Sequence, residues 1–366
     1  MNILYDGQIY ALNPSGGICR YFTKLISKLP ANFIPSLITC QDFTIKIHYP
    51  IHPNLKIYKR LNFRSSRISY WLEKPYLRAV STLGRFELAH PTYYSLFTQQ
   101  KIDQYRCPVV LTVYDMIYEI FRNKIDPTGE HVELKKKAIL SAQKLICISE
   151  NTKKDLINWY SVPEEKIIVT YLAAGIDASL SDGDEPVPSR PYYLYVGSRD
   201  TTYKNFDTLL LAFENVVSIN AEIILCVVGY PFSETEIKRI AELKLTERIE
   251  HYTYASDSHL AKLYRCSVAF VYPSFYEGFG IPPLEAMSCG TPVIASNRSS
   301  IPEVVGDAGL LFNPNSVSDL TDSLLFLFDN PIERDRLIAK GFQRAKAFSW
   351  DKTVSQTLDV YYSLVK

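Results

Sequence analysis

Two glutamates, Glu277 and Glu285, lie in one stretch of the sequence, YPSFYEGFGIPPLEAMSCGTPVIAS at 272–296, on either side of two adjacent prolines. Pro282 and Pro283 forbid one continuous helix between the two acids, and they suit the first turn of a helix that follows. We therefore expect Glu277 in a loop after a strand and Glu285 in the first helical turn. Taken alone, Glu285 is better explained as an acid that complements the helix dipole.

The backbone between the two acids offers a second kind of chemistry. Gly278 to Ile281 precede the expected helix start, where unpaired amides and the helix dipole favour an anion or sugar hydroxyls. Chance rarely supplies a strand, a glutamate, Gly-Phe-Gly and a proline-started helix in this order. The whole stretch therefore indicates a binding site, although its single residues do not.

Two cations follow another predicted strand, in YVGSRDTTYKNF at 195–206. Arg199 as a planar fork and Lys204 as a point charge, beside a helix start, suit a diphosphate. By spacing alone, two solvated loop cations explain the pattern equally well.

The first predicted strand is followed by NPSGGICRYFTKL, in which Gly16 and Gly17 precede a helix. Glycines let the backbone approach a ligand closely, but a lone Gly-Gly is more often just a turn. The pattern is not GxGxxG and therefore supports no dinucleotide site.

Other polar residues stand at the ends of predicted strands. Tyr114 and Asp115 end a buried strand, and Asp115 is a candidate for acceptor or sugar contact. His90 also closes a strand, although a histidine there is more often structural. Before a helix that Ser256 caps, the segment 252–255 is placed to contact a nucleobase, with Tyr254 as the candidate.

Two serines are predicted to cap helices. Ser149 precedes ENTKKDL and lies at the same strand-end edge as the other candidates. Ser300 opens SIPE, a capping box that explains Glu303 without any chemistry.

Strand-length apolar runs alternate with segments of helical period, which is typical of βαβ units with parallel sheets. The alternation occurs twice, and the 366 residues suit two domains better than one. We predict an α/β domain at 1–176, a flexible linker at 177–191, a second α/β domain at 192–349 and a helix at 350–366 that packs back on the first. Two doubly wound sheets whose carboxyl ends face each other across a cleft would hold a ligand there.

Composition excludes several classes of protein. With 40 basic and 39 acidic residues, the chain has no electrostatic footprint for nucleic acid. We see neither a secretory signal nor an apolar run long enough to span a bilayer, and seven cysteines without a CxxC pair indicate reduced thiols. The expected location is the cytoplasm. The basic and aromatic stretch 58–78 is a candidate for peripheral contact with the inner membrane face, although a solvated surface explains it about as well.

The stretch YEGFGIPPLEAMSCGTPVIAS, followed by PEVVGDAG, closely resembles the signature of family 4 retaining nucleotide-sugar glycosyltransferases, which have the paired-Rossmann GT-B fold. By this resemblance Glu285 would bind the donor ribose, and Glu277 the hydroxyls of the transferred sugar. Arg199 and Lys204 would stabilise the leaving diphosphate. Where many relatives have His-Asp, this chain has Tyr114-Asp115.

The resemblance implies that 1–176 is the acceptor domain and that 192–349 is the nucleotide-sugar donor domain. It also implies a full set of site residues. Catalytic roles fall to Glu277, Arg199, Lys204 and Asp115. Donor-binding residues are Gly16, Gly17, Arg199, Lys204, Tyr254, Glu277, Gly278, Phe279, Gly280, Ile281, Leu284 and Glu285, and further sugar or acceptor contacts are His90, Tyr114 and Ser149.

The implied reaction moves a hexose from a nucleoside-diphosphate sugar, UDP-glucose first and GDP-mannose second, to an acceptor hydroxyl with retention of configuration. No metal or other cofactor is expected, since cations and helix amides take the place of the metal. The opening YDGQIY with GGICRYF resembles enzymes of bacterial surface or exopolysaccharide assembly, which implies a lipid-linked saccharide acceptor.

Two alternatives stay open. The departure at Tyr114 would suit a nucleotide-sugar-binding protein of the same fold that has lost transfer. A GT-B epimerase or a phosphorylase would be another class of enzyme, and a phosphorylase would need a lysine that anchors pyridoxal phosphate.

Overall fold

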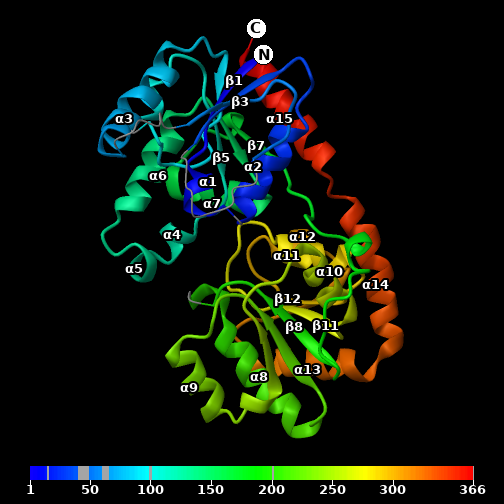
Figure 1. Cartoon of the computed structure of the whole chain (residues 1–366). Helices are drawn as coiled ribbons and strands as arrows, with labels where there is room; N and C mark the ends of the chain where they lie inside the picture. Colours follow the sequence, from blue (N-terminus) through cyan, green and yellow to red (C-terminus); the bar gives the residue numbers. More distant parts are fainter. Residues whose placement is uncertain (15, 40–48, 60–65, 99–100, 200–201, 366) are drawn as a thin grey trace. The chain divides into compact units, whose positions relative to one another are not determined.

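The computed structural model describes residues 1–14, 16–39, 49–59, 66–98, 101–199 and 202–365, with side chains of 66–71 left out. The chain divides into two compact units (Figure 1). The first unit comprises Met1–Leu172 and Trp350–Lys366, and the second comprises Ala173–Ser349. Each unit is an α/β layer structure built on parallel strands.

The first unit contains two groups of parallel strands, in the order β3-β2-β1-β4 and β5-β6-β7. An isolated parallel bridge between Ala89 and Val109 joins the two groups. The strands are β1 (Asn2–Asp6), β2 (Ile34–Ile38), β3 (Lys56–Tyr58), β4 (Leu88–Ala89), β5 (Val110–Val113), β6 (Lys144–Cys147) and β7 (Ile167–Val169). Because all run parallel, the residues that follow β4, β5 and β6 share one edge of the unit.

Helices cover these strands with their apolar stripes. They are α1 (Ile9–Leu12), α2 (Gly17–Ser27), α3 (Ser66–Leu83), α4 (Ile117–Ile120), α5 (Arg122–Ile125), α6 (Glu130–Ser141), α7 (Glu150–Tyr160) and α15 (Trp350–Leu364), with short 3-10 turns at Ile102–Gln104 and Glu164–Lys166. In α2 the side chains at Tyr21, Phe22, Leu25 and Ile26 are buried, as helical spacing predicts. The C-terminal helix α15 belongs to this unit.

A buried polar network ties α15 to the strands. The Tyr361 hydroxyl lies 2.6 Å from His90 Nδ1 and 3.2 Å from the Tyr5 hydroxyl, and His90 Nε2 lies 2.8 Å from Thr112 Oγ1. Complete burial lowers the pKa of His90 to about 3, so the imidazole is neutral at pH 7. The network satisfies both ring nitrogens inside the core.

The second unit is a single six-stranded parallel sheet in the order β10-β9-β8-β11-β12-β13. Its strands are β8 (Tyr192–Val196), β9 (Ile224–Val228), β10 (Ile249–Tyr252), β11 (Ala269–Tyr272), β12 (Val293–Ser296) and β13 (Gly309–Phe312). The chain winds outward in both directions from β8 and β11. These neighbouring strands therefore form the topological switch point, outside whose carboxyl ends ligands bind in open α/β sheets.

The helices of the second unit are α8 (Phe206–Ile219), α9 (Glu234–Glu242), α10 (Asp257–Cys266), α11 (Ile281–Ser288), α12 (Ile301–Val305), α13 (Val317–Asp329) and α14 (Pro331–Lys346), with 3-10 turns at Ala178–Leu180, Thr202–Lys204 and Thr246–Arg248. Leu209, Leu210 and Phe213 of α8 pack with Val227 and Val271 of the sheet in one buried core. This is the apolar stripe that the spacing in 206–217 predicts.

The segment 177–191 differs from the flexible linker that its composition predicts. Glu185 accepts a hydrogen bond of 2.6 Å from Ser258, and Lys262 Nζ donates to the backbone oxygens of Gly183 and Glu185 at 2.7 and 2.9 Å. His259 Nε2 lies 2.8 Å from the Pro186 oxygen. Because α10 supplies polar partners for this backbone, the segment becomes ordered without a large apolar contact.

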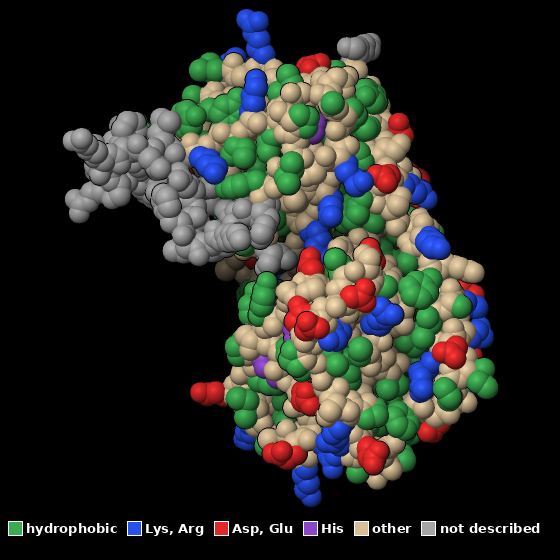
Figure 2. All heavy atoms as spheres, turned by 45° about the vertical axis from the view of Figure 1, so that its right-hand side comes forward, with side chains coloured by type: hydrophobic (Ala, Val, Ile, Leu, Met, Phe, Trp, Pro, Cys, Tyr) green, Lys and Arg blue, Asp and Glu red, His purple; other side chains and the backbone are tan. Residues whose placement is uncertain are grey.

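Charges of both signs are interspersed on the face of the molecule that Figure 2 shows, consistent with the near-zero net charge. Within the described ranges, no helix combines the length and the apolar character that a membrane crossing requires. The predicted membrane-contact stretch 58–78 lies partly outside the described residues.

Candidate active site

The switch point of the second unit brings together two residues that sequence reasoning singled out separately. Lys204 follows β8 and Glu277 follows β11, and Lys204 Nζ donates a 2.8 Å hydrogen bond to Glu277 Oε1. Their side chains are 16% and 10% exposed, so the ion pair is largely desolvated but still reachable. A half-buried pair of this kind can exchange its internal contact for a ligand's phosphate and hydroxyl groups.

Two serines hold the Glu277 loop in place. The Glu277 amide donates to Ser299 Oγ at 2.9 Å, and buried Ser300 Oγ lies 2.8 Å from the backbone oxygens of both Glu277 and Phe279. The predicted capping box at Ser300 is therefore wrong, because its hydroxyl makes no side-chain cap and instead fixes this loop. The sequence did not reveal this role of Ser300, because a serine before Ile-Pro-Glu is already explained as a helix cap.

Backbone geometry explains the glycine before α11. Gly280 has a φ of 123°, a backbone angle that residues other than glycine rarely adopt. Helix α11 then begins at Ile281 with prolines in its first turn. Leu284 is fully buried and Phe279 is 3% exposed, so both pack inside the unit. The amides of Gly278 to Ile281 thus lie at the start of α11, as the sequence predicts.

Glu285 lies in the first turns of α11 and is a buried residue, 5% exposed. Its Oε1 accepts a hydrogen bond from the Gly175 amide at 3.3 Å. Glu285 therefore has a partner in the backbone besides the helix dipole, and its contact with a donor ribose stays a prediction.

Arg199 is placed differently from the prediction of an open diphosphate ligand. Its Nε donates to Glu236 Oε1 at 2.8 Å, Nη2 donates to the Tyr230 oxygen, and the guanidinium lies 4.4 Å from the ring centroid of Phe232. The side chain is only 2% exposed. Arg199 therefore orders the start of α9, where Glu236 also closes a capping box with Ser233.

The remaining predicted residue of this unit, Tyr254, is 82% exposed just before α10. Its exposure permits contact with a base, and this contact stays a prediction. Of the predicted donor residues, the structure brings Lys204 and Glu277 into direct contact, but not Arg199, whose hydrogen bonds go elsewhere.

In the first unit, three residues predicted to contact sugar have hydrogen-bond partners inside the protein. His90 is fully buried with both nitrogens engaged by Tyr361 and Thr112. The Tyr114 hydroxyl donates to the Thr92 oxygen at 2.7 Å, and buried Ser149 caps α7 by accepting from the Thr152 amide at 2.9 Å. Each polar group is already satisfied inside the protein, so the structure does not support direct sugar contacts from them.

Gly16 caps the start of α2 with an ordinary φ of −78°, so no unusual backbone angle demands glycine there. A Cβ on Gly16 would lie 2.4 Å from the end of the exposed Asn13 side chain, which would have to move to make room for it. The predicted approach of Gly16 and Gly17 to donor phosphates stays untested.

Asp115 is 27% exposed after β5, and its Oδ1 accepts from the Ile117 amide at 3.0 Å. Beneath it lies Lys135 of α6, which is 1% exposed and donates to the Asp115 backbone oxygen at 2.6 Å and to Glu119 Oε2 at 2.9 Å. The Tyr160 hydroxyl donates to the other oxygen of Glu119 at 2.5 Å. Lys135 was not predicted, although its place on the stripe of Val132, Ala138 and Ile139 was a signal.

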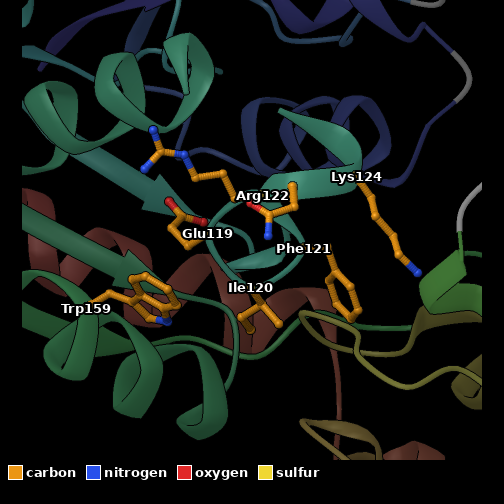
Figure 3. Close-up of a pocket in the computed structure, with 7 residues that line it drawn as sticks. Glu119, Ile120, Phe121, Arg122, Lys124 and Trp159 are labelled. Atoms are coloured by element: carbon orange, nitrogen blue, oxygen red, sulfur yellow. The ribbon is translucent and has the colours of Figure 1, made fainter. Parts of the chain in front are cut away.

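A cavity of about 450 Å³ opens beside this network. Figure 3 shows its lining, in which Trp159 of α7 and residues of α4 and α5 take part: Glu119, Ile120, Phe121, Arg122, Asn123 and Lys124. Over the described part of the chain, no group of three or more metal-ligating side chains is arranged to hold a metal. Metal independence itself stays a prediction.

Two family models match the chain in series. The model described as glycosyltransferase family 4 matches residues 15–178, and the model described as glycosyl transferases group 1 matches 181–344. The chain belongs to the group 1 glycosyltransferases. The same models cover both units of this family member, including the Lys204–Glu277 pair in the group 1 half.

Curated relatives of this family member include O-antigen chain mannosyltransferase B of Escherichia coli, 35% identical over 60% of the chain and 61% of the relative. Another is an MMP α-(1→4)-mannosyltransferase of Mycolicibacterium hassiacum, 34% identical over 63% of the chain and 56% of the relative. The matched region thus spans about three fifths of these relatives.

Solved structures confirm the fold. Sucrose-phosphate synthase from Thermosynechococcus elongatus superposes with a TM-score of 0.79 at 20% identity, covering 99% of this chain and 98% of that one. Anabaena HepE, solved with UDP and glucose, has a TM-score of 0.73 at 16% identity and covers 99% of both chains. The predicted GT-B architecture of two Rossmann-like parallel units is therefore confirmed.

Proposed function

We propose that this protein transfers a hexose from a nucleoside-diphosphate sugar to a hydroxyl of a saccharide acceptor. The observation that carries the proposal is the Lys204–Glu277 pair at the switch point, in a loop fixed by Ser299 and Ser300. Lys204 would move to the leaving diphosphate, where negative charge grows as the sugar–phosphate bond breaks. Glu277 would then accept hydrogen bonds from the hydroxyls of the transferred sugar, and Glu285 from the ribose.

For the donor, we propose GDP-mannose ahead of UDP-glucose. The two relatives at 34% and 35% identity are both mannosyltransferases, whereas HepE with UDP and glucose, at 16% identity, supports the fold alone. The order of the two sugars expected from the sequence is thus reversed. The acceptor that suits these relatives is a growing oligosaccharide, lipid-linked in the case of surface polysaccharide assembly.

For the stereochemistry, we propose retention without a covalent enzyme intermediate. The bond from the anomeric carbon to the phosphate oxygen breaks, the acceptor oxygen bonds to that carbon from the same face, and the acceptor proton passes to the departing phosphate. Two-carboxylate glycosidases need both acids at the scissile bond. Here Glu285 is bound to the Gly175 amide and Glu277 to Lys204, which supports a route without a carboxylate nucleophile.

The test is incubation of the purified protein with GDP-mannose or UDP-glucose and octyl α-D-mannopyranoside in the presence of a chelator. We expect an α-linked disaccharide and free GDP, read by NMR of the anomeric proton. A β-linked product would overturn retention, and a product from UDP-glucose alone would overturn the choice of donor. Nucleotide-sugar binding without any product would favour the alternative of a binding protein.

A further inference from the structure

Three aromatic rings and a carboxylate gather at the carboxyl edge of the first unit. Tyr93 follows β4, Asp115 follows β5, Tyr118 lies in α4 and His131 in the first turn of α6. The rings of Tyr118 and His131 stack with centroids 3.8 Å apart, and the Tyr93 hydroxyl lies 3.5 Å from His131 Nε2. These four residues are called the aromatic cluster below.

The aromatic cluster is only half-buried, unlike the rings that support it. Tyr94 contacts the rings of Tyr93 and His131 and is 6% exposed, and Tyr114, which packs on Tyr94, is 5% exposed. Each of the four cluster residues, in contrast, keeps part of its surface in solvent. Asp115 uses Oδ1 for the Ile117 amide, and among the described residues Oδ2 has no hydrogen-bond partner. The cluster therefore offers flat ring surface next to an acceptor oxygen.

The charges around the cluster select against an anionic ligand. Burial, with the charge of Lys135 as a further cause, lowers the pKa of His131, so its imidazole is neutral at pH 7. The Lys135 ammonium is 1% exposed and already paired with Glu119. The groups that face solvent are the Asp115 carboxylate and neutral aromatic rings. The carboxylate would repel a phosphate, whereas the rings and the carboxylate can both bind a polyol.

We propose that the aromatic cluster binds a pyranose ring of the saccharide acceptor. The C–H face of the sugar packs on Tyr118 and Tyr93, whose ring faces carry partial negative charge, and a sugar hydroxyl donates to Asp115 Oδ2. Lys135 is a positioning residue, since its bond to the Asp115 backbone oxygen fixes the turn that carries the carboxylate. This inference rests on the proposed function, because it names the surface that the acceptor would use.

The proposal is tested first by binding, without catalysis. Saturation-transfer NMR with methyl α-D-mannopyranoside should show contact with aromatic protons in the wild type. Tyr118→Leu and the nearly isosteric Asp115→Asn should each weaken this binding about tenfold, the loss of one ring face or one hydrogen bond. The matched control is Trp159→Leu, which removes a half-exposed ring from the cavity of Figure 3 and should leave binding unchanged.

Transfer kinetics supply the second readout. With octyl α-D-mannopyranoside as acceptor, Tyr118→Leu should raise the acceptor KM about tenfold, while the thermal shift produced by GDP stays as in the wild type. Thermal melting without ligand identifies any variant that fails to fold. If Tyr118→Leu does not fold, the acceptor KM of Asp115→Asn, which keeps the side-chain shape, tests the proposal instead.

The outcomes separate the two proposals. Unchanged saccharide binding and KM in Tyr118→Leu and Asp115→Asn, or loss in Trp159→Leu instead, would overturn the aromatic cluster as the acceptor site while leaving transfer intact. Saccharide binding that depends on Tyr118, in a protein that neither binds nor turns over a nucleotide sugar, would support the cluster and overturn the proposed function.

Discussion

The two units present polar groups at the carboxyl edges of their sheets in different ways. In the second unit, Lys204 and Glu277 form a direct ion pair on a loop whose backbone is fixed by Ser299 and Ser300. In the first unit, Asp115 has one carboxylate oxygen without a hydrogen-bond partner among the described residues, beside half-buried rings, and buried Lys135 bonds to its backbone oxygen. The second unit thus holds a paired cation and anion at its edge, whereas the first unit offers aromatic surface beside one carboxylate.

This difference matches two different ligands. A diphosphate leaving group needs a fixed cation, because charge develops on it in the transition state. A saccharide acceptor needs shape and hydrogen-bond acceptors, but little charge. If the second unit binds the diphosphate and the first unit binds the acceptor, substitutions in the second unit should lower kcat. Substitutions in the first unit should raise the acceptor KM or lower local stability.

The largest effect is expected at the ion pair. Lys204→Met removes the cation that meets the developing phosphate charge, and kcat should fall about 10³-fold. Steady-state kinetics with the preferred donor measure this loss. The control is Lys238→Met on the exposed face of α9, which should retain wild-type turnover; a Lys204 variant that matched it would remove the basis for the comparison.

The next largest effect is expected on stability. Lys135→Met leaves Glu119 buried without its cation, so the free energy of unfolding should drop by about 3 kcal/mol. Urea unfolding measures it. Adding Glu119→Gln removes the stranded charge and should recover part of the loss, and an equal loss in both variants would show that Lys135 acts by packing alone.

Ser300→Ala tests whether loop fixation matters to the second unit's site. Losing the hydroxyl between two buried backbone oxygens should cost about 1 to 2 kcal/mol of stability and reduce kcat about tenfold. The matched control is Ser218→Ala, an exposed serine that also donates to a backbone oxygen, where both losses should be within error. A kcat unchanged in Ser300→Ala would show that the loop is rigid without it.

The smallest net effect concerns pH and the core of the first unit. His90 has a pKa lowered to about 3, so its contribution to stability is present above pH 6.5 and is lost as pH falls toward 3. Burial raises the pKa of Asp6 to about 6 against the hydrogen bonds from Phe97 and Thr98, so its contribution has the opposite sign and weakens as pH rises from 4 to 6. Between pH 6.5 and 5 the two contributions to the free energy of unfolding should nearly cancel, so the wild-type value should change by no more than about 1 kcal/mol.

Single variants separate these two contributions. In His90→Asn, unfolding stability should increase from pH 6 to pH 5, relative to the wild type, because Asp6 alone remains. In Asp6→Asn it should decrease over the same range by about 1.4 kcal/mol per pH unit. Parallel pH profiles for the wild type and both variants would contradict the assignment of buried, shifted groups.

Sequence reasoning succeeded where local structure is determined by neighbouring residues. The order strand, Glu277, Gly-Phe-Gly and a proline-started helix is local, and the structure reproduces it with Gly280 at a positive φ and α11 beginning at Ile281. The alternation of strands and helices also predicted two parallel α/β units. Both are short-range properties, which propensity and periodicity determine directly.

It did not predict the partner of a side chain when that partner is distant in the chain. Arg199 pairs with Glu236 and His90 with Tyr361, whereas the sequence suggested a phosphate and a sugar as their partners. Ser300 looked like a helix cap but holds a loop 21 to 23 residues earlier. A single sequence contains no information on which of several satisfactory partners a polar group takes.

The sequence by itself determined the elements and the contiguous loop at Glu277, because backbone sterics of proline and glycine and the period of apolar residues act over a few residues. The tertiary structure alone decided that Lys204 meets Glu277, that Lys135 lies beneath Asp115, and that Tyr93, Tyr118 and His131 share one surface. Those contacts join segments that are brought together only when the parallel strands align, and burial then requires every enclosed polar group to find a partner.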